Sequence, residues 1–339
     1  MQENKPTLQA PGTSTRLGEL LDAHEIKQLT SIPALRPVLD IAATWAWVLG
    51  SLALAAFYPH WLVYTISFIV IASRQLAMTH LVHDASHYRL FPSRRANDML
   101  CDLFAAGPVL ISTESYRVQH LPHHQHLGDH LKDSDQRTWY NVKGAHFWRR
   151  SLLTLIGWEA VQTFGSYMQA SNSVAGKQAG GGDLAWRLAC AALGNGLILA
   201  WCVGLGEPWL YVWLWFLPMF TLTMYLLILR VVAEHQTLDY ARQGEDRADQ
   251  DFDAPLVRTI SGGLIGRFLL GPMNFNYHHE HHLAPGIPYA NLPQLHRRLK
   301  ELGYYDDKPE ALEPSYLSAL RKLVFPPARP SAECLTQQT

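Results

Sequence analysis

Four long apolar runs constrain the fold of this chain more than any other feature. They cover residues 38–58, 61–79, 185–205 and 209–229. An α-helix rises 1.5 Å per residue, so a run of about 20 residues crosses a hydrocarbon layer of about 30 Å. Buried helices of a soluble core are usually shorter and more amphipathic. We therefore interpret the runs as membrane spans and expect an all-α integral membrane protein.

Short turns join these runs in pairs, which predicts two helical hairpins. Pro59 and His60 connect the first pair, and residues 206–208 connect the second. Neither turn contains Lys or Arg. The opposite side receives Lys27, Arg36, Arg89, Arg94, Arg95, Arg149, Arg150, Arg230 and Arg242. By the positive-inside rule, both termini and the segment between the hairpins face the cytoplasm, at the inner membrane in a prokaryote.

The domain organisation follows from these spans. Residues 1–37 form a cytosolic N-terminal segment, residues 38–300 the membrane domain and residues 301–339 a cytosolic C-terminal tail. Polar residues interrupt two further apolar stretches, which are expected to be helices in or under the membrane interface and cover residues 97–111 and 151–168. A glycine-rich linker is expected over residues 171–182, and disorder from Pro326 onward.

Composition excludes several functions. A net charge of -1 gives no basic face for nucleic acid. The four cysteines form no CxxC pair, which excludes a zinc ribbon or a cysteine-ligated iron–sulfur cluster on this chain. Histidine is abundant instead, with 17 residues, most of them in short clusters.

Three histidine clusters are predicted on the cytoplasmic side. His83 and His87 have i, i+4 spacing beyond the second apolar run, so one helical face presents both rings. The second cluster has i, i+3, i+4 spacing, and comprises His120, His123 and His124. In the same register the third comprises His278, His281 and His282, although His279 also has i, i+3 spacing to His282. His235, at the cytosolic end of the fourth run, is a ninth candidate.

Eight or nine imidazoles exceed the needs of one ion and suit two. A zinc hydrolase site has three protein ligands and an open position, and HExxH is absent from the sequence. Imidazole binds Fe, Cu, Zn and Ni, so the ligands alone predict only a dinuclear transition-metal site. Carboxylates near the clusters are candidates to orient the rings, although each taken singly is interpreted as a solvated surface group: Asp84, Asp129, Asp133, Asp135, Glu234 and Glu280.

The sequence resembles the membrane fatty acid desaturase family, which includes lipid hydroxylases and carotenoid ketolases. The resemblance covers roughly residues 40–300 and rests on HDASH at 83–87, RVQHLPHH at 117–124 and GPMNFNYHHEHHLAPGIPYANLP at 271–293. It implies four spanning helices with a cytosolic helical cap that holds a di-iron site. The eight clustered histidines would bind the irons and His235 would complete the set. Asn274 or Asn276 would orient a bound water or a ligand.

The resemblance also implies the chemistry. The expected reaction is O2-dependent desaturation of a lipid acyl chain, on a fatty acyl or sphingolipid-like substrate, with two Fe ions and O2 as co-substrate. No GxGxxG motif and no fused haem module is evident, so electrons are expected from a separate ferredoxin, rubredoxin or cytochrome-type donor. No catalytic residue beyond the metal ligands is predicted. The isolated His24, His60, His146 and His296 are not expected to touch metal, and His126 and His130 break the spacing of the second cluster.

Two alternatives remain open. A hydroxylase or carotenoid-type ketolase would use the same ligands, because the outcome depends on how the substrate lies against the oxidant. A histidine-rich metal transporter is the alternative of another class. Transport sites lie near the membrane midplane, whereas these clusters are predicted beyond the apolar runs.

Overall fold

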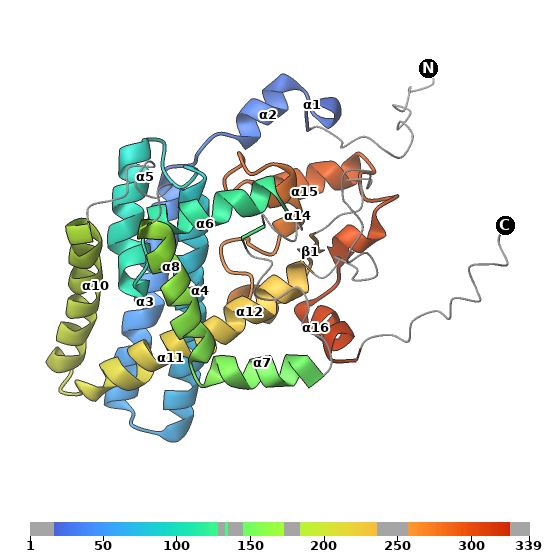
Figure 1. Cartoon of the computed structure of the whole chain (residues 1–339). Coiled ribbons are helices and arrows are strands. Elements are labelled where there is room, and N and C mark those ends of the chain that lie inside the picture. Colours follow the sequence, from blue (N-terminus) through green and yellow to red (C-terminus); the bar gives the residue numbers. More distant parts are fainter. Residues whose placement is uncertain (1–16, 128–132, 135–144, 173–183, 236–256, 326–339) are drawn as a thin grey trace, which may run out of the picture.

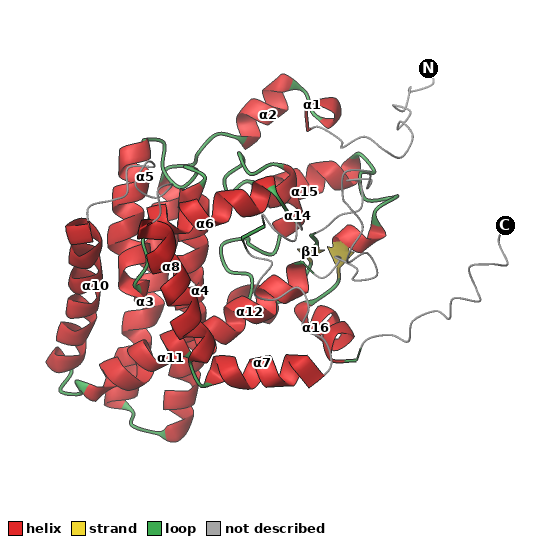
Figure 2. Cartoon of the chain, in the orientation of Figure 1, coloured by secondary structure: helices red, strands yellow, loops and turns green. Residues whose placement is uncertain are grey.

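The computed structural model describes residues 17–127, 133–134, 145–172, 184–235 and 257–325. This part of the chain is mostly helical and contains almost no strand (Figure 2). Before the first histidine motif lie α1 (Leu17–Leu20), α2 (Ala23–Leu29) and α3 (Leu35–Phe57), followed by α4 (Trp61–Ser86). A capping box between Asp22 and Glu25 begins α2, which lies against the C-terminal part of the chain.

Within the described residues, four helical stretches are long and apolar enough to cross a membrane. They are α3, α4, α10 (Leu184–Gly204) and Tyr211–Glu234. α3 and α4 lie side by side over most of their length, and α10 stands at the edge of the bundle (Figure 1). Large apolar side chains face outward from this bundle, such as Trp47, Leu54 and Leu197. A soluble domain rarely exposes such a surface, which supports an integral membrane protein.

The fourth predicted span is less regular than one helix over residues 209–229. It contains a π-helical segment η3 (Tyr211–Phe216), α11 (Leu217–Phe220) and α12 (Leu222–Glu234). The break falls at Thr221, whose φ and ψ of -121° and -89° are not helical. Because Pro218 lacks an N–H and its ring crowds the preceding turn, the helix is irregular there. α12 continues past residue 229 and ends beside His235.

The two stretches expected at the interface are each divided. Residues 97–111 span part of α5 (Arg94–Cys101), the π-helical η1 (Asp102–Ala106) and the 3-10 helix η2 (Gly107–Val109). Residues 151–168 fall in α7 (Ala145–Leu155) and α8 (Trp158–Asn172). Gly157, with a φ of +85°, makes the turn between these two helices, a conformation that favours glycine. The expected linker at 171–182 and the tail beyond residue 325 lie outside the described residues, apart from the end of α8.

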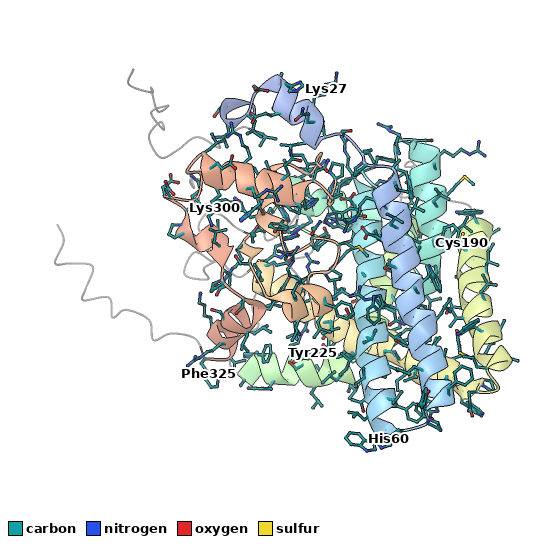
Figure 3. All side chains as sticks on the ribbon, turned by 180° about the vertical axis from the view of Figure 1, so that it is seen from behind. Lys27, His60, Cys190, Tyr225, Lys300 and Phe325 are labelled. Carbon is teal, nitrogen blue, oxygen red and sulfur yellow. The ribbon has the colours of Figure 1, made fainter. Side chains whose placement is uncertain are left out.

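The C-terminal part covers the ends of α4 and α12. It consists of β1 (Thr259–Ile260), α13 (Leu264–Leu269), α14 (His278–Leu283), α15 (Leu292–Glu301), the 3-10 helix η6 (Pro309–Ala311), β2 (Leu312–Glu313) and α16 (Tyr316–Val324). β1 and β2 pair in parallel, with Thr259 opposite Leu312. Residues 301–325, assigned to a tail from the sequence, therefore fold back onto the molecule. Figure 3 shows Lys27 and Lys300 at the end of the molecule opposite His60.

Candidate metal centre

The first histidine motif lies at the C-terminal end of α4. His83 is in the last turn of this helix and His87 is its C-cap residue. α4 is exposed at its beginning but almost fully buried over its last four turns. The apolar run and the motif thus form one continuous helix, as the sequence predicted, and its buried end carries both rings.

The second motif lies on α6 (Thr113–Gln125). A capping box between Ser112 and Ser115 begins this helix. Asp102 of η1 fixes the same end, because its carboxylate accepts hydrogen bonds of 2.8 Å from both the backbone N–H and the hydroxyl of Thr113. The spacing i, i+3, i+4 then directs three rings from one helical face: His120, His123 and His124.

The third motif forms the short helix α14. Met273 and Asn274 precede it with φ values of 59° and 56°, which non-glycine residues rarely adopt and which are often found at functional sites. His278, His281 and His282 turn toward the other clusters. His279 turns away, because its Nδ1 lies 3.1 Å from the Val257 carbonyl and its Nε2 lies 3.2 Å from the Tyr304 hydroxyl.

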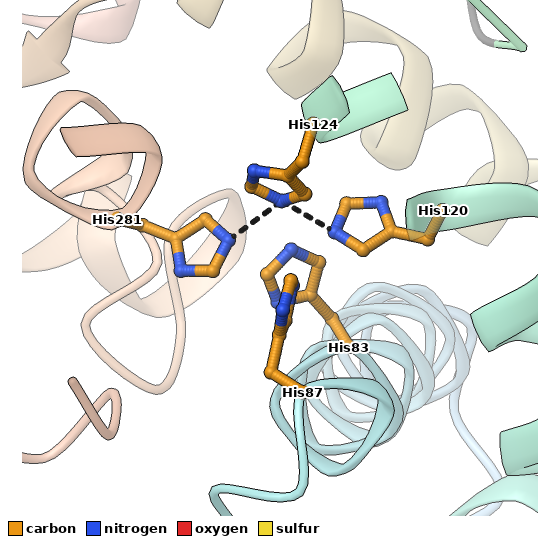
Figure 4. A group of neighbouring side chains, drawn as sticks. All are labelled: His83, His87, His120, His124 and His281. Carbon is orange, nitrogen blue, oxygen red and sulfur yellow. Dashed lines mark hydrogen bonds between the residues drawn. The ribbon is translucent and has the colours of Figure 1, made fainter. Parts of the chain in front are cut away.

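Five rings meet in a first group. It contains His83, His87, His120, His124 and His281, whose nearest nitrogens all lie within 4.8 Å of one another. The side chains come from three elements and point toward a common centre (Figure 4). His124 Nε2 is 2.9 Å from His120 Nε2 and 3.0 Å from His281 Nε2.

A second group lies beside the first. It contains His123, His235 and His282, each of which offers one ring nitrogen within 4.8 Å of those of the other two. His235 Nε2 is 3.2 Å from His123 Nε2. His278 adjoins this group, with its Nε2 3.2 Å from His235 Nε2 and 3.1 Å from His282 Nε2. All nine candidate histidines therefore lie in two neighbouring groups, as two metal positions require.

Burial keeps these rings neutral. It is the largest cause that lowers the pKa of His87 to about 4 and that of His124 to about 2, and the charges of Arg117 and Arg89 lower the pKa of His87 further. Burial also holds five other pKa values well below 6.5, those of His120, His235, His278, His281 and His282. A neutral imidazole has a lone pair free for a metal ion, so the rings are in the state that ligation needs.

The nearby carboxylates differ from the expectation that each is a solvated surface group. The four that the structure describes are all buried: Asp84, Asp133, Glu234 and Glu280. Asp133 Oδ1 lies 2.8 Å from His123 Nδ1, and Glu234 lies 3.7 Å from His278 Nδ1. The remaining two, Asp129 and Asp135, lie outside the described residues.

Asp84 and Glu280 have other partners. Asp84 accepts a hydrogen bond from the backbone N–H of Tyr289 at 3.1 Å. Glu280 accepts from the hydroxyls of Thr259 and Tyr305, and its Oε1 lies 2.5 Å from His296 Nδ1. These two carboxylates therefore hold backbone and neighbouring elements around the motifs. His296, not expected to be a ligand, is part of this support.

The two asparagines make protein contacts. Asn276 donates to the Ile260 carbonyl at 3.0 Å, and Asn274 donates to the Tyr289 carbonyl at 3.3 Å. Both hydrogen bonds therefore hold the turn that precedes α14 in place. Of the other isolated histidines, His60 caps the N-terminus of α4, His24 contacts Gln28 and His146 is exposed. His126 ends α6, and His130 lies outside the described residues.

A cavity of about 610 Å³ opens against the histidines. Its apolar wall comes from residues 109–111 and from α11 and α12, with Met219, Phe220, Leu227, Ile228 and Val231. His80, which the sequence analysis missed, also lines it. His80 Nδ1 lies 3.0 Å from the Pro272 carbonyl and its ring stacks on Phe275 at 4.0 Å. The sequence could have indicated His80, because it lies three residues before His83 and shares its helical face.

Comparisons with known proteins identify a family and two relatives. A family profile described as fatty acid desaturase matches residues 59–311. The chain is 28% identical over 274 residues to a dihydrorhizobitoxine desaturase of Bradyrhizobium elkanii, covering 76% of this chain and 74% of that protein. It is 26% identical over 221 residues to a beta-carotene ketolase of Paracoccus sp. (strain N81106 / MBIC 01143), covering 63% of this chain and 71% of that protein.

The chain therefore belongs to the fatty acid desaturase family, as its motifs predicted, and is an oxidoreductase of the desaturase type. The family is one of iron-using membrane enzymes, and the histidine groups described above are able to bind metal.

Proposed function

We propose that this protein catalyses O2-dependent desaturation of an aliphatic chain, on an acyl-lipid type of substrate, at a di-iron centre. The proposed ligands are the nine histidines, five around one iron and four around the other. The single observation that carries this proposal is the convergence of three distant motifs and His235 into two adjacent groups.

The hydrogen bonds of two rings support a metal between them. The Asp133 carboxylate accepts from His123 Nδ1, and the Val231 carbonyl, 3.0 Å away, accepts from His235 Nδ1. A neutral ring with its proton on Nδ1 has a lone pair on Nε2. The two Nε2 atoms are 3.2 Å apart, so two lone pairs face each other. A bound cation would accept both and remove this repulsion, which fits the donor set of an iron site.

The remaining residues position the substrate and keep water away. Two irons held by these histidines would supply, with O2, the chemistry that removes hydrogen from an unactivated C–H bond. The apolar wall formed by Leu227, Ile228 and Val231 would hold an aliphatic segment beside the rings. Electrons would come from a separate ferredoxin, rubredoxin or cytochrome-type donor.

We further propose that the four apolar stretches insert as two hairpins, with the histidine groups and both termini on the cytoplasmic side. The positions of the rings support this arrangement, because they lie at the ends of α4 and α12, away from the His60 turn. The same placement disfavours a metal transporter, whose binding site would lie near the middle of the bundle.

Insertion of oxygen is the second candidate function. The similarity to a beta-carotene ketolase favours it specifically, since that enzyme's name states a different outcome within the same family. Both reactions would use the same histidines, and the position of the substrate carbon in the cavity would decide between them.

Expression in a host of known lipid composition tests the proposal. Mass spectrometry of total lipids should show new species lighter by two hydrogens, and species heavier by one oxygen would favour hydroxylation instead. His124→Ala and His282→Ala should abolish the product while the protein remains folded in the membrane. Normal product from either variant would remove that residue from the site.

A further inference from the structure

An ion pair between a buried carboxylate and a guanidinium side chain that is 28% exposed lies on the wall of the cavity. Arg150 Nη1 of α7 is 3.2 Å from Glu159 Oε1 of α8. Glu159 is 2% exposed, and both residues line the cavity. Figure 1 shows α8 in front of the α3–α4 bundle, with α7 leading into it.

Stability alone does not explain this pair. Taking the Glu159 carboxylate out of water costs about as much as its attraction to Arg150 returns, so an apolar residue of the same size often serves as well. Ligand pockets are mostly apolar and contain a few polar or charged groups that fix the orientation of the ligand. The position of Arg150 and Glu159 against the cavity fits that role.

The polar character continues along α8. Gln162, Thr163 and Ser166 line the same cavity, at i+3, i+4 and i+7 from Glu159. Residues with this spacing share one helical face. The outward side of α8 carries apolar residues instead, with Trp158 and Val161 more than half exposed. Ala160 and Phe164 of α8 also line the cavity, so polar residues form the larger part, but not the whole, of this wall.

A pure hydrocarbon substrate would not match such a wall. Apolar atoms against Arg150 and Glu159 would displace water and return no hydrogen bond, which costs free energy. A guanidinium binds a carboxylate or phosphate, and a carboxylate binds an ammonium group. One end group that carries both charges would satisfy the two residues together.

We propose that the substrate carries a zwitterionic end group, one ammonium with one carboxylate or phosphate, which Arg150 and Glu159 bind while its aliphatic part extends along α12 toward the histidines. This inference rests on the proposed function, because it takes the cavity as the substrate site. The chemistry fits an amino-acid-like molecule or the head group of a zwitterionic lipid.

Binding of a matched C8 series tests the inference. The full-length iron-loaded protein in phosphatidylglycerol nanodiscs is titrated calorimetrically with 2-aminooctanoic acid, octanoic acid, octylamine and 1-octanol. The zwitterion should bind at least about tenfold more tightly than the others, a difference of about 1.4 kcal/mol. Glu159→Gln and Arg150→Gln should each remove this preference, whereas the exposed controls Glu207→Gln and Arg149→Gln should keep it.

Equal dissociation constants across the series would overturn the inference, as would a preference that survives in both cavity variants. Unchanged iron content and melting temperature show that each variant is folded. Competition by dihexanoyl phosphatidylethanolamine distinguishes the two sources of a zwitterionic group. If this lipid displaces 2-aminooctanoic acid, the result supports a lipid head group; if it does not, the result supports a soluble zwitterion. Binding is measured without turnover, so the two proposals are tested separately. Loss of the preference for the zwitterion would leave the desaturase proposal standing. Absence of a dehydrogenated product would not change the measured dissociation constants.

Discussion

Asp133 and His123 form a fully buried pair, with Asp133 Oδ1 2.8 Å from His123 Nδ1 and both side chains at most 1% exposed. A carboxylate on the second nitrogen of a histidine fixes the tautomer and the ring orientation, and it makes the other nitrogen a better donor to metal. Asp133 lies ten residues after His123 in the sequence, so a loop residue supports a ring on α6.

Replacement of this carboxylate should weaken one iron position. Loss of such a partner typically lowers metal affinity or activity about 10–100-fold, so we expect Asp133→Ala to lose the iron held by the His123 group first. Iron per chain, measured after dialysis against graded chelator, checks this. Asp307→Ala, at an exposed carboxylate, is the matched control. Wild-type iron retention in Asp133→Ala would show that the pair is only structural.

Removal of metal should destabilise the protein. Without a cation, the facing lone pairs of His123 and His235 lose their common acceptor. A ligand that binds only the folded state stabilises it, by about 2.7 kcal/mol at 100 times its dissociation constant. Chelation should therefore lower the melting temperature, and added Fe²⁺ should restore it. An identical melting temperature with and without chelator would argue against a resident metal.

Helical spacing in the sequence predicted which of the clustered histidines share a helical face. Helical spacing placed His83 with His87, and His120 with His123 and His124, on common faces, and the structure brings both sets together with His281 and His282. Long apolar runs likewise predicted the helices that now appear as α3, α4 and α10. In these cases the interactions that determine the structure are local, and they appear in the sequence as a helical period.

Longer-range contacts left no such signal. The parallel pairing of Thr259 with Leu312, and the ion pair between Arg150 and Glu159, join residues whose neighbours in sequence give no reason to meet. Glu280 was a candidate to orient a metal-binding ring, although taken singly it was interpreted as a solvated surface carboxylate. The structure turns it to the opposite side of the short helix α14, since adjacent helical residues point in different directions.

Glu280 should matter for the stability of the third motif. It is 0% exposed and accepts hydrogen bonds from Thr259 and Tyr305, with His296 as a third neighbour. Glu280→Gln keeps the size but presents an N–H₂ to these donors, so we expect a loss of about 1–3 kcal/mol in unfolding free energy. Denaturant titration measures it. His296→Ala, which removes one partner, should cost less, and a larger loss in that variant would contradict this account.

Acid should weaken the connection between β1 and β2. Burial raises the pKa of Glu313, but hydrogen bonds from Lys322 and Ser318 and the charges of Lys322 and Arg258 outweigh it and hold the value below 4.5. Because the pKa of Glu313 is lower in the folded than in the unfolded protein, its ionised carboxylate stabilises the folded state. This stabilisation is complete above about pH 4.5 and is lost as pH falls through the folded-state pKa. Melting temperatures of wild type and Glu313→Gln should therefore differ at pH 7 and converge below pH 4.5. A constant difference would refute this linkage.

Gly271 leaves no room for a side chain at the turn before α14. An added Cβ would lie 2.7 Å from the hydroxyl of Tyr316 and 2.9 Å from Cβ of Asn276. Tyr316 is 3% exposed and donates to Glu234 at 3.0 Å, beside His278, so it has little freedom to move. Overpacking of this kind costs about 1–3 kcal/mol. We expect Gly271→Ala to lower both the melting temperature and product formation, whereas Gly263→Ala, where a Cβ meets nothing within 4 Å, should leave both near wild type. If Gly271→Ala lost stability but retained full turnover, the contact from Tyr316 to Glu234 would have no part in positioning His278.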